Sequence, residues 1–336
     1  MSAVSPSQDQ VERQIEQFRK SFAIVREEVS RIIVGNEDNI VGIMTCLLVR
    51  GHVLLEGIPG IGKTKLVQTL ADVLHLKFSR IQFTPDLMPG DIIGGTMVRE
   101  SETGKKSLEF QRGPIFANLV LADEVNRATP KTQSALLEAM QDVSVTVGRT
   151  TYQLEQPFLV LATQNPLEME GTYPLPEAQL DRFFFKLKLG FPSADGLHEI
   201  LDRTTRQQEP VVDRVLGQGE VLEMRETARA VPVARPIQQY AIDITLATHP
   251  ETERATQMTR RFVRFGSSPR GTQALILGGK VNALLAGRVH VSCEDIRATA
   301  LNALRHRLLL NFDAEAERVD ADAILRDVLE RVPEPR

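Results

Sequence analysis

The sequence predicts an α/β fold, in which helices flank a five-stranded parallel sheet, followed by a C-terminal domain that is all helical. Two observations lead to this prediction. In the first part of the chain, five short apolar runs alternate with helical stretches, a pattern typical of strands that are buried on both faces of a parallel sheet. Beyond about residue 193 the strand signals mostly cease and helical periodicity takes over.

The N-terminal elements can be assigned in order. Residues 7–32 predict a polar, amphipathic helix, and residues 34–51 predict a second helix that enters the first strand. The predicted strands lie at 52–56, 78–83, 118–124, 158–165 and 182–189. Gly, Pro and Ser cluster at 190–196, so we place the domain boundary there and expect domains at 1–192 and 193–336.

Two segments predict β-hairpins that are inserted into the first domain. Residues 94–114 alternate around a turn at "ETGK", before the third strand, and residues 143–155 alternate around "GRT", before the fourth. Projecting hairpins of this kind would engage a substrate or a partner. A ribbon that packs on its own domain is the alternative.

Composition describes a folded protein of about two domains, with 336 residues, 42% of them hydrophobic and 25% charged. The two cysteines, Cys46 and Cys293, form no C-x-x-C pair, which argues against a disulfide framework or a zinc site. No apolar run approaches the roughly 18 residues that span a bilayer, and the N-terminus lacks a signal-peptide core. We therefore expect a cytoplasmic protein. A net charge of −4 provides no overall basic field to attract nucleic acid.

A glycine-rich loop, "GIPGIGKT" at 57–64, follows the first strand and precedes a helical stretch. In this context the backbone N–H groups and the helix dipole favour a phosphate anion. Lys63 would reach the terminal phosphates, and the Thr64 hydroxyl would ligate Mg²⁺. We therefore expect ATP and Mg²⁺ as cofactors, with the nucleotide-binding residues Gly57, Pro59, Gly60, Ile61, Gly62, Lys63, Thr64 and Lys65.

Adjacent carboxylates, Asp123 and Glu124, end the third predicted strand. Ligands of parallel sheets bind at the carboxyl ends of the strands, so this pair should lie near the phosphate loop. Asp123 would support Mg²⁺, and Glu124 would polarise the water that attacks the γ-phosphate. A polar strand end that starts a helix is the bland alternative.

Two further candidates follow these carboxylates in the chain. Asn165, at the end of the fourth strand, could hold the attacking water or a γ-phosphate oxygen, although an Asn before Pro also forms turns. Arg182 precedes the fifth strand and could act on a neighbour's nucleotide as an arginine finger. A structural ion pair with Asp181 or Glu177 is the alternative.

The motifs "GIPGIGKT", "LVLADEVNRA", "LATQNP" and "EAQLDRF", with "GSSPRGTQAL" at 266–275, together resemble the AAA+ ATPases, and in particular the MoxR family. This resemblance covers about residues 30–330 and implies a P-loop AAA+ core with a helical lid. It implies that Lys63 and Thr64 belong to Walker A, Asp123 and Glu124 to Walker B, and Asn165 to sensor 1. It also identifies Arg182 with the arginine finger and Arg270 with sensor 2, which contacts nucleotide from the lid.

The resemblance further implies a homo-oligomeric ring, commonly a hexamer, that acts as a chaperone-like motor on a protein client, often one with a von Willebrand factor A domain. The closest alternative is the ATPase subunit of a magnesium chelatase. A helicase-like motor is a second alternative, although no nucleic-acid module is present. The basic stretch from Arg254 to Arg288 could face nucleotide, a neighbouring subunit or solvent.

Overall fold

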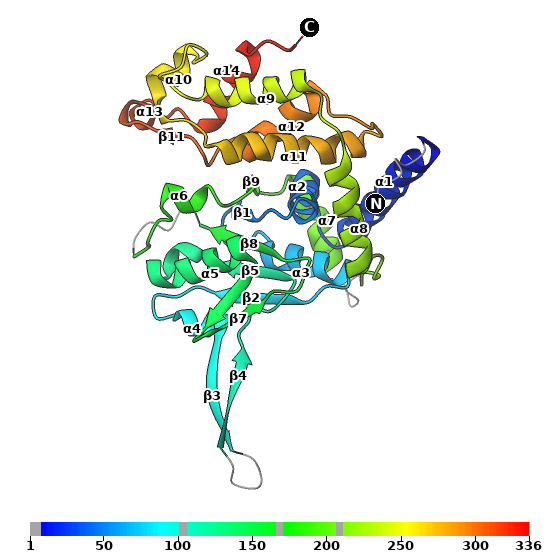
Figure 1. Ribbon diagram of the computed structural model, residues 1–336, viewed down its shortest axis with the longest axis vertical. Coiled ribbons are helices and arrows are strands. Elements are labelled where there is room, and N and C mark those ends of the chain that lie inside the picture. Colours follow the sequence, from blue (N-terminus) through cyan, green and yellow to red (C-terminus); the bar gives the residue numbers. More distant parts are fainter. Residues whose placement is uncertain (1–7, 101–105, 166–170, 206–210, 336) are drawn as a thin grey trace.

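The computed structural model describes residues 8–100, 106–165, 171–205 and 211–335. Five parallel strands form the central sheet in the spatial order β2, β5, β8, β1, β9 (Figure 1). Their bounds are β1 (Val53–Glu56), β2 (Phe78–Gln82), β5 (Leu119–Asp123), β8 (Leu159–Gln164) and β9 (Phe185–Lys188). The predicted strands are confirmed, except that β9 begins three residues later than predicted. Its first predicted residues continue a turn instead, since the Arg182 and Phe183 amides donate to Gln179 and Leu180.

Helices cover both faces of the sheet because successive strand residues point to opposite sides. Leu55, Leu121 and Leu161 pack in the core formed with the N-terminal helices and the C-terminal helices. Val120 and Val160 pack on the other face, against α5. The helices of this part are α1 (Gln8–Ser30), α2 (Glu37–Leu48), α3 (Lys63–Val73), α4 (Pro89–Ile93), α5 (Pro130–Asp142), α6 (Glu177–Leu180), α7 (Ala194–Thr204) and α8 (Gln218–Ala230).

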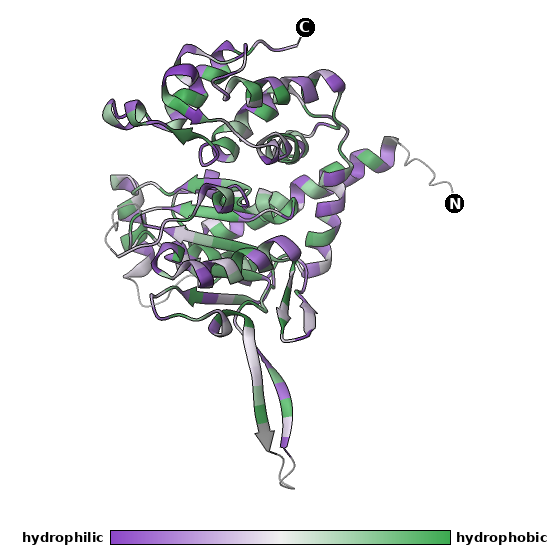
Figure 2. Cartoon of the chain, turned by 60° about the vertical axis from the view of Figure 1, so that its left-hand side comes forward, coloured by the Kyte–Doolittle hydropathy of each residue, from purple (hydrophilic) through white to green (hydrophobic). Residues whose placement is uncertain are grey.

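The two predicted hairpins are both present. In the first, β3 (Gly94–Glu100) pairs with β4 (Lys106–Arg112) and extends far from the body, with apolar residues along it (Figures 1 and 2). Its predicted turn, "ETGK", is residues 102–105 and lies outside the described residues. In the second, β6 (Ser144–Val147) pairs with β7 (Thr150–Gln153). Phe110 of the first hairpin stacks on Tyr152 of the second, with ring centroids 4.2 Å apart, so the two hairpins are in contact.

The C-terminal part lies above the sheet in Figure 1 and forms the predicted helical lid. The lid is not entirely helical as predicted, because it also contains a short antiparallel pair of strands, β10 (Val263–Phe265) and β11 (Leu309–Leu310). Helix α8 contacts α1, α2 and α11, so it packs on both parts of the protein, and the boundary at 192/193 stays a prediction. The lid helices are α9 (Arg235–Ala247), α10 (Gln257–Phe262), α11 (Pro269–Leu285), α12 (Cys293–Leu304), α13 (Phe312–Ala316) and α14 (Ala321–Arg331).

Within the described segments, no helix is both long enough and apolar enough to cross a bilayer.

Candidate nucleotide site

The glycine-rich loop connects β1 to α3, as predicted. Gly60 and Gly62 have φ angles of 79° and 87°, in the left-handed region that glycine enters without steric cost. The Lys63 ammonium group donates a 2.7 Å hydrogen bond across the loop to the Gly57 carbonyl. Burial lowers the pKa of Lys63, while the nearby charges of Asp123 and Glu124 oppose that shift. The loop therefore has the backbone of a phosphate cradle, with its cation close to the two predicted carboxylates.

Asp123, at the end of β5, is buried and has both carboxylate oxygens engaged. Its Oδ1 accepts a 2.7 Å hydrogen bond from the Thr163 hydroxyl on β8. Its Oδ2 accepts a 2.6 Å hydrogen bond from Nη2 of Arg80 on β2. Strands on both sides of β5 thus orient this carboxylate, since the register sets Asp123 beside Gln82 and Ala122 beside Ala162.

Glu124 has a left-handed backbone, with φ 56° and ψ 50°, which is uncommon for a residue other than glycine. Its amide donates a 2.8 Å hydrogen bond to Oγ1 of Thr163. Its Oε2 accepts hydrogen bonds from the Gln82 amide at 2.9 Å and from Arg127 at 3.0 Å. Backbone and side chain of Glu124 are therefore both held by neighbouring residues. Strained backbone of this kind is concentrated at functional sites.

Asn165 lies next to the phosphate loop because β8 pairs with β1. Glu56 pairs with Gln164, and the Gly57 amide approaches the Gln164 carbonyl at 3.5 Å. Asn165 directly follows the last residue of β8 and is buried. The fold thus gathers Lys63 and Thr64 with Asp123, Glu124 and Asn165 at the carboxyl edge of the sheet.

Three residues of this edge, Arg80, Gln82 and Thr163, were missed by the sequence analysis. Each contacts Asp123 or Glu124. Thr163 and Gln82 lie near the ends of predicted strands, and this position is the sequence feature that could have identified them as site residues. Only the pairing order of the sheet shows that they reach the carboxylates.

A cavity of about 340 Å³ adjoins the phosphate loop. Its other walls come from the chain before α2 and from α7, and most of the lining is apolar. Asn36 is one of its polar residues. An apolar cavity with a few polar groups beside a phosphate cradle suits a nucleobase. Among its lining residues are Ile33, Val34, Asn36, Pro59, Gly60, Gly62, Phe191, Leu197 and Ile200.

Arg182 and Arg270 line a different cavity, of about 240 Å³. This second cavity is formed by residues that precede β1 and β9, including Gly51, His52 and Phe184, together with the start of α11. Because the strands are parallel, it lies at the opposite edge of the sheet from the phosphate loop. The structure therefore brings Arg182 and Arg270 together, but does not bring either of them to the phosphate loop of their own chain.

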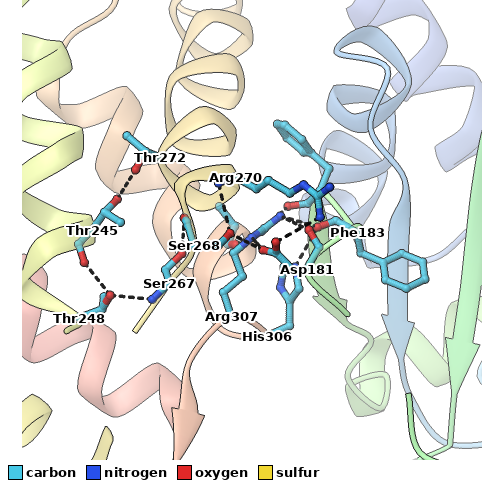
Figure 3. Close-up of polar contacts among 12 residues, drawn as sticks. Asp181, Phe183, Thr245, Thr248, Ser267, Ser268, Arg270, Thr272, His306 and Arg307 are labelled. Atoms are coloured by element: carbon cyan, nitrogen blue, oxygen red, sulfur yellow. Dashed lines mark hydrogen bonds and ion pairs between the residues drawn. The ribbon is translucent and has the colours of Figure 1, made fainter. Parts of the chain in front are cut away.

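Asp181 joins this edge to the lid (Figure 3). Its carboxylate accepts a 2.6 Å hydrogen bond from Ser268, a 2.9 Å bond from Arg307 and a 3.3 Å contact from Arg270. Asp181 thus pairs with lid residues, whereas the adjacent Arg182 donates to the Leu137 carbonyl at 2.9 Å. The ion pair of Arg182 with Asp181 or Glu177, considered from the sequence, is not among the contacts of the described residues.

Arg307 and His306 of the lid attach to the same segment, residues 181–184. The buried Arg307 donates to the carbonyls of Phe183 at 2.7 Å and Phe184 at 3.2 Å. His306 Nε2 lies 2.9 Å from the Phe183 carbonyl. Burial lowers the pKa of His306 well below its usual value, and the Arg307 charge lowers it further, so the ring is neutral at pH 7 and donates from Nε2.

Most cations of the basic stretch 254–288 are also paired within the chain. Arg254 binds Asp243 at 2.8 Å, and Arg288 binds Asp295 at 2.6 Å. Arg261 pairs with Glu317. The stretch is therefore not a continuous unpaired basic surface.

Comparison with known proteins decides the family. The model of the ATPase family associated with various cellular activities (AAA) matches residues 52–185, and that of the AAA lid domain matches 255–328. Chaperone MoxR1 of Mycobacterium tuberculosis is 42% identical, over 92% of this chain and 81% of its own length. The chain belongs to the MoxR family of AAA+ ATPases. A second relative, Protein MoxR of Methylorubrum extorquens, is 30% identical over 95% of this chain.

The fold of this chain also resembles that of a solved structure over nearly its whole length. A crystal structure of a Cytophaga hutchinsonii protein, described as a candidate ATPase, superimposes with a TM-score of 0.90 at 38% identity. It covers 98% of this chain, and the match covers 99% of that protein. The arrangement of the sheet and the lid is therefore shared with that structure over 98% of this chain.

The residues of this MoxR-family site fit ATP with Mg²⁺. An added Cβ would meet nothing within 4 Å at Gly60 or Gly62, so the loop is open toward a ligand, and Lys63 supplies a cation for phosphate. Thr64, in the first turn of α3, and Asp123 supply oxygen ligands of the kind Mg²⁺ prefers. Among the described residues, no group of three or more His, Cys, Asp or Glu side chains is arranged to hold a metal ion.

Proposed function

We propose that this protein hydrolyses ATP to ADP and phosphate. In this mechanism Lys63 binds the terminal phosphates, Glu124 accepts a proton from the attacking water, and Asn165 orients that water or a γ-phosphate oxygen. Thr64 and Asp123 would hold Mg²⁺. The observation that carries the proposal is the placement of Glu124, which is held by Thr163 and Gln82 next to the phosphate loop. When bound, Mg²⁺ would neutralise charge that develops on the phosphates.

The chemistry is tested by separating binding from hydrolysis. Lys63→Ala should weaken ATP binding, because a charge on the phosphates is lost. Glu124→Gln should bind ATP with wild-type affinity and turn it over at least about 100-fold more slowly, since general-base catalysis contributes about 10²–10⁴ in rate. Binding is measured by calorimetry and turnover by phosphate release. Undiminished turnover in Glu124→Gln would contradict the assigned role.

We also propose that the protein assembles into a closed ring, commonly a hexamer in this family, with nucleotide at each interface. The phosphate loop lies at one edge of the sheet, whereas Arg182 and Arg270 lie at the other. A head-to-tail contact between subunits would bring these two edges together, and repetition of that contact closes a ring. In this arrangement Arg182 and Arg270 both serve the nucleotide of the neighbouring subunit.

The ring is tested by mixing inactive subunits. Arg182→Ala should bind ATP but lose most of its activity, because an arginine finger is worth about 10³–10⁵ in rate. Mixed with Lys63→Ala, it should recover activity at interfaces that combine an intact loop with an intact finger. Sedimentation with ATP would report the ring itself. Mixtures that never exceed the sum of the two variants would count against a shared site.

The client in this proposal is another protein, which the motor remodels or matures in the cytoplasm. The name of the M. tuberculosis relative, Chaperone MoxR1, supports a chaperone-like role, and a protein with a von Willebrand factor A domain is the client that the family resemblance suggests. The hairpin β3–β4 offers a contact surface, because Met97, Val98 and Leu108 are largely exposed. Free thiols at Cys46 and Cys293 agree with a reducing compartment.

A pull-down with Glu124→Gln, which should trap the ATP-bound state, would identify the client. The helicase-like and chelatase-like alternatives are separated by ATPase stimulation. Single-stranded DNA, duplex DNA and the captured protein would be compared at physiological salt, with Lys105→Ala, Lys106→Ala as the hairpin variant. Strong stimulation by DNA that this variant abolishes would favour the helicase-like motor, because DNA binding depends on phosphate contacts. A chelatase subunit would instead retrieve a porphyrin-metallating partner.

A further inference from the structure

The cavity that contains Arg182 and Arg270 is lined by four arginines. Arg50 and Arg307 are the other two, and Asp181 is the only acidic residue among the described residues that line the cavity. His52, which also lines the cavity, adds no charge at pH 7, since burial lowers its pKa to about 4. The cavity thus carries a strong excess of positive charge.

The four arginines differ in how many hydrogen bonds and ion pairs their guanidinium groups form within the chain. Arg307 is buried and bound to Asp181 and several carbonyls. Within the described residues, the guanidinium groups of Arg182 and Arg270 each have one polar partner, the Leu137 carbonyl and the Asp181 carboxylate respectively. Arg50 makes no hydrogen bond within the described residues, and its one ion pair there, with Glu226, is 3.7 Å long and exposed on both sides. Arg50 is therefore the cation of this cavity with the most unused binding capacity.

The backbone of Arg50 is also unusual. Helix α2 ends at Leu48, and Arg50 has a φ angle of 59°. Glycine would adopt this left-handed conformation without steric cost, but arginine does so at some cost. The Gly51 amide donates a 2.8 Å hydrogen bond to the Cys46 carbonyl, so this conformation closes the C-terminal turn of α2 at a position that glycine usually occupies.

Like charges oppose one another around this cavity. Burial, together with the charge of Arg50, lowers the pKa of Arg225 to about 10. Burial likewise lowers the pKa of Arg307, and among its charged neighbours Arg270 acts in the same direction, against Asp181. An anion in the cavity would relieve this repulsion and would form charge-assisted hydrogen bonds with the arginines.

We infer that Arg50 is a third phosphate-contacting arginine, which acts with Arg182 and Arg270 on the polyphosphate of ATP bound to the neighbouring subunit. This inference rests on the proposed ring. The same edge of the sheet presents all three side chains, since Arg50 precedes β1 just as Arg182 precedes β9. Their common ligand is an anion with several phosphate oxygens, because three forked guanidinium groups can each bind a pair of oxygens.

The decisive variant is Arg50→Gly, which removes the cation and suits the left-handed backbone. We expect its unfolding temperature to equal or exceed that of the wild type. We expect its ATPase rate at saturating ATP to fall about 10- to 100-fold, the loss typical of one charge-assisted hydrogen bond. ATP binding at its own loop should be unchanged. The matched control is Arg229→Ala, which removes an arginine that lines the adjoining cavity but not this one, and should change the rate less than twofold.

Subunit mixing tests whether Arg50 acts across the interface. Arg50→Gly mixed with Lys63→Ala should regain activity, as Arg182→Ala mixed with Lys63→Ala should. The inference is wrong if Arg50→Gly keeps the wild-type rate. It is also wrong if mixing with Lys63→Ala restores the activity of Arg182→Ala but does not restore that of Arg50→Gly. If Arg182→Ala itself keeps full activity or is not restored by mixing, the proposed ring site fails instead. Added inorganic phosphate that restores Arg50→Gly without mixing would assign the cavity to a free anion and overturn the inference.

Discussion

Thr163→Val is expected to impair both stability and hydrolysis, because one buried hydroxyl supports both carboxylates of the candidate site. Thr163 Oγ1 donates to Asp123 Oδ1 at 2.7 Å and accepts from the Glu124 amide at 2.8 Å. Valine has the same shape but can make neither bond. Each polar group left without its partner costs about 1–2 kcal/mol, so the free energy of unfolding should fall by about 2–4 kcal/mol.

This loss of free energy converts into a shift of the unfolding temperature. An entropy of unfolding of about 2.1 cal/mol/K per residue, over a cooperative unit of roughly 200 residues, gives about 2.4 °C per kcal/mol. Scanning calorimetry should therefore show a decrease of about 5–10 °C. The ATPase rate should fall at least about tenfold, since the strained backbone of Glu124 loses the bond that holds it and each tenfold corresponds to about 1.4 kcal/mol.

Two controls separate the hydroxyl from the methyl group of Thr163. Thr163→Ser retains the hydroxyl, so it should keep most of the ATPase rate, although the lost methyl group costs about 1 kcal/mol of stability. Thr205→Val removes an exposed hydroxyl that donates to the Leu201 carbonyl and should leave ATPase unchanged. A Thr163→Val protein that unfolds within about 1 °C of the wild type and hydrolyses ATP at the wild-type rate would refute the reasoning.

Two further predictions concern the acid sensitivity of the core and the contact between the hairpins. His52 is buried and has a pKa of about 4 in the folded protein, against about 6.5 in the unfolded chain. As the pH falls, the unfolded chain therefore binds a proton before the folded protein does. The free energy of unfolding should decrease by about 2 kcal/mol between pH 7 and pH 5. Urea unfolding of the wild type and of His52→Asn at both pH values measures this, and an equal loss in the two proteins would argue against His52 as the cause. Tyr152→Ala should weaken client-stimulated ATPase, because Phe110 loses the ring on which it stacks, while basal ATPase stays within about twofold. Arg149→Ala, at the turn of the same hairpin, is the control, and equal effects of the two variants would contradict a specific role for the stack.

The sequence predicted the sheet and the phosphate loop well because their signals are local. Apolar runs mark the buried strands, and the spacing of Gly57, Gly62 and Lys63 marks the loop wherever it occurs. The contacts of Arg80 and Gln82 with the carboxylates are not local. They depend on β2 lying beside β5, and no feature of either strand's own sequence specifies that neighbour.

The position of Arg270 could not be predicted for a different reason. Its motif predicts a lid residue that contacts nucleotide, but which nucleotide it would reach depends on how the lid docks. Here Ser268, Arg270 and Arg307 all bind Asp181, so the start of α11 lies against the edge that carries Arg182. That docking arises from long-range contacts between residues about 90 to 126 positions apart, which local patterns do not encode.

The same docking bears on how a lid movement would reach the neighbouring subunit. Arg307 binds the carboxylate of Asp181 and the carbonyls of residues 181, 183 and 184, and it is almost entirely buried. Separating the lid from this segment would leave a buried cation without partners, and breaking such a buried network costs about 3–5 kcal/mol. A rotation of the lid should therefore carry residues 181–184 with it rather than slide past them. Arg182 would then move toward or away from the neighbour's nucleotide together with Arg270, so that the two arginines respond to the lid as one unit.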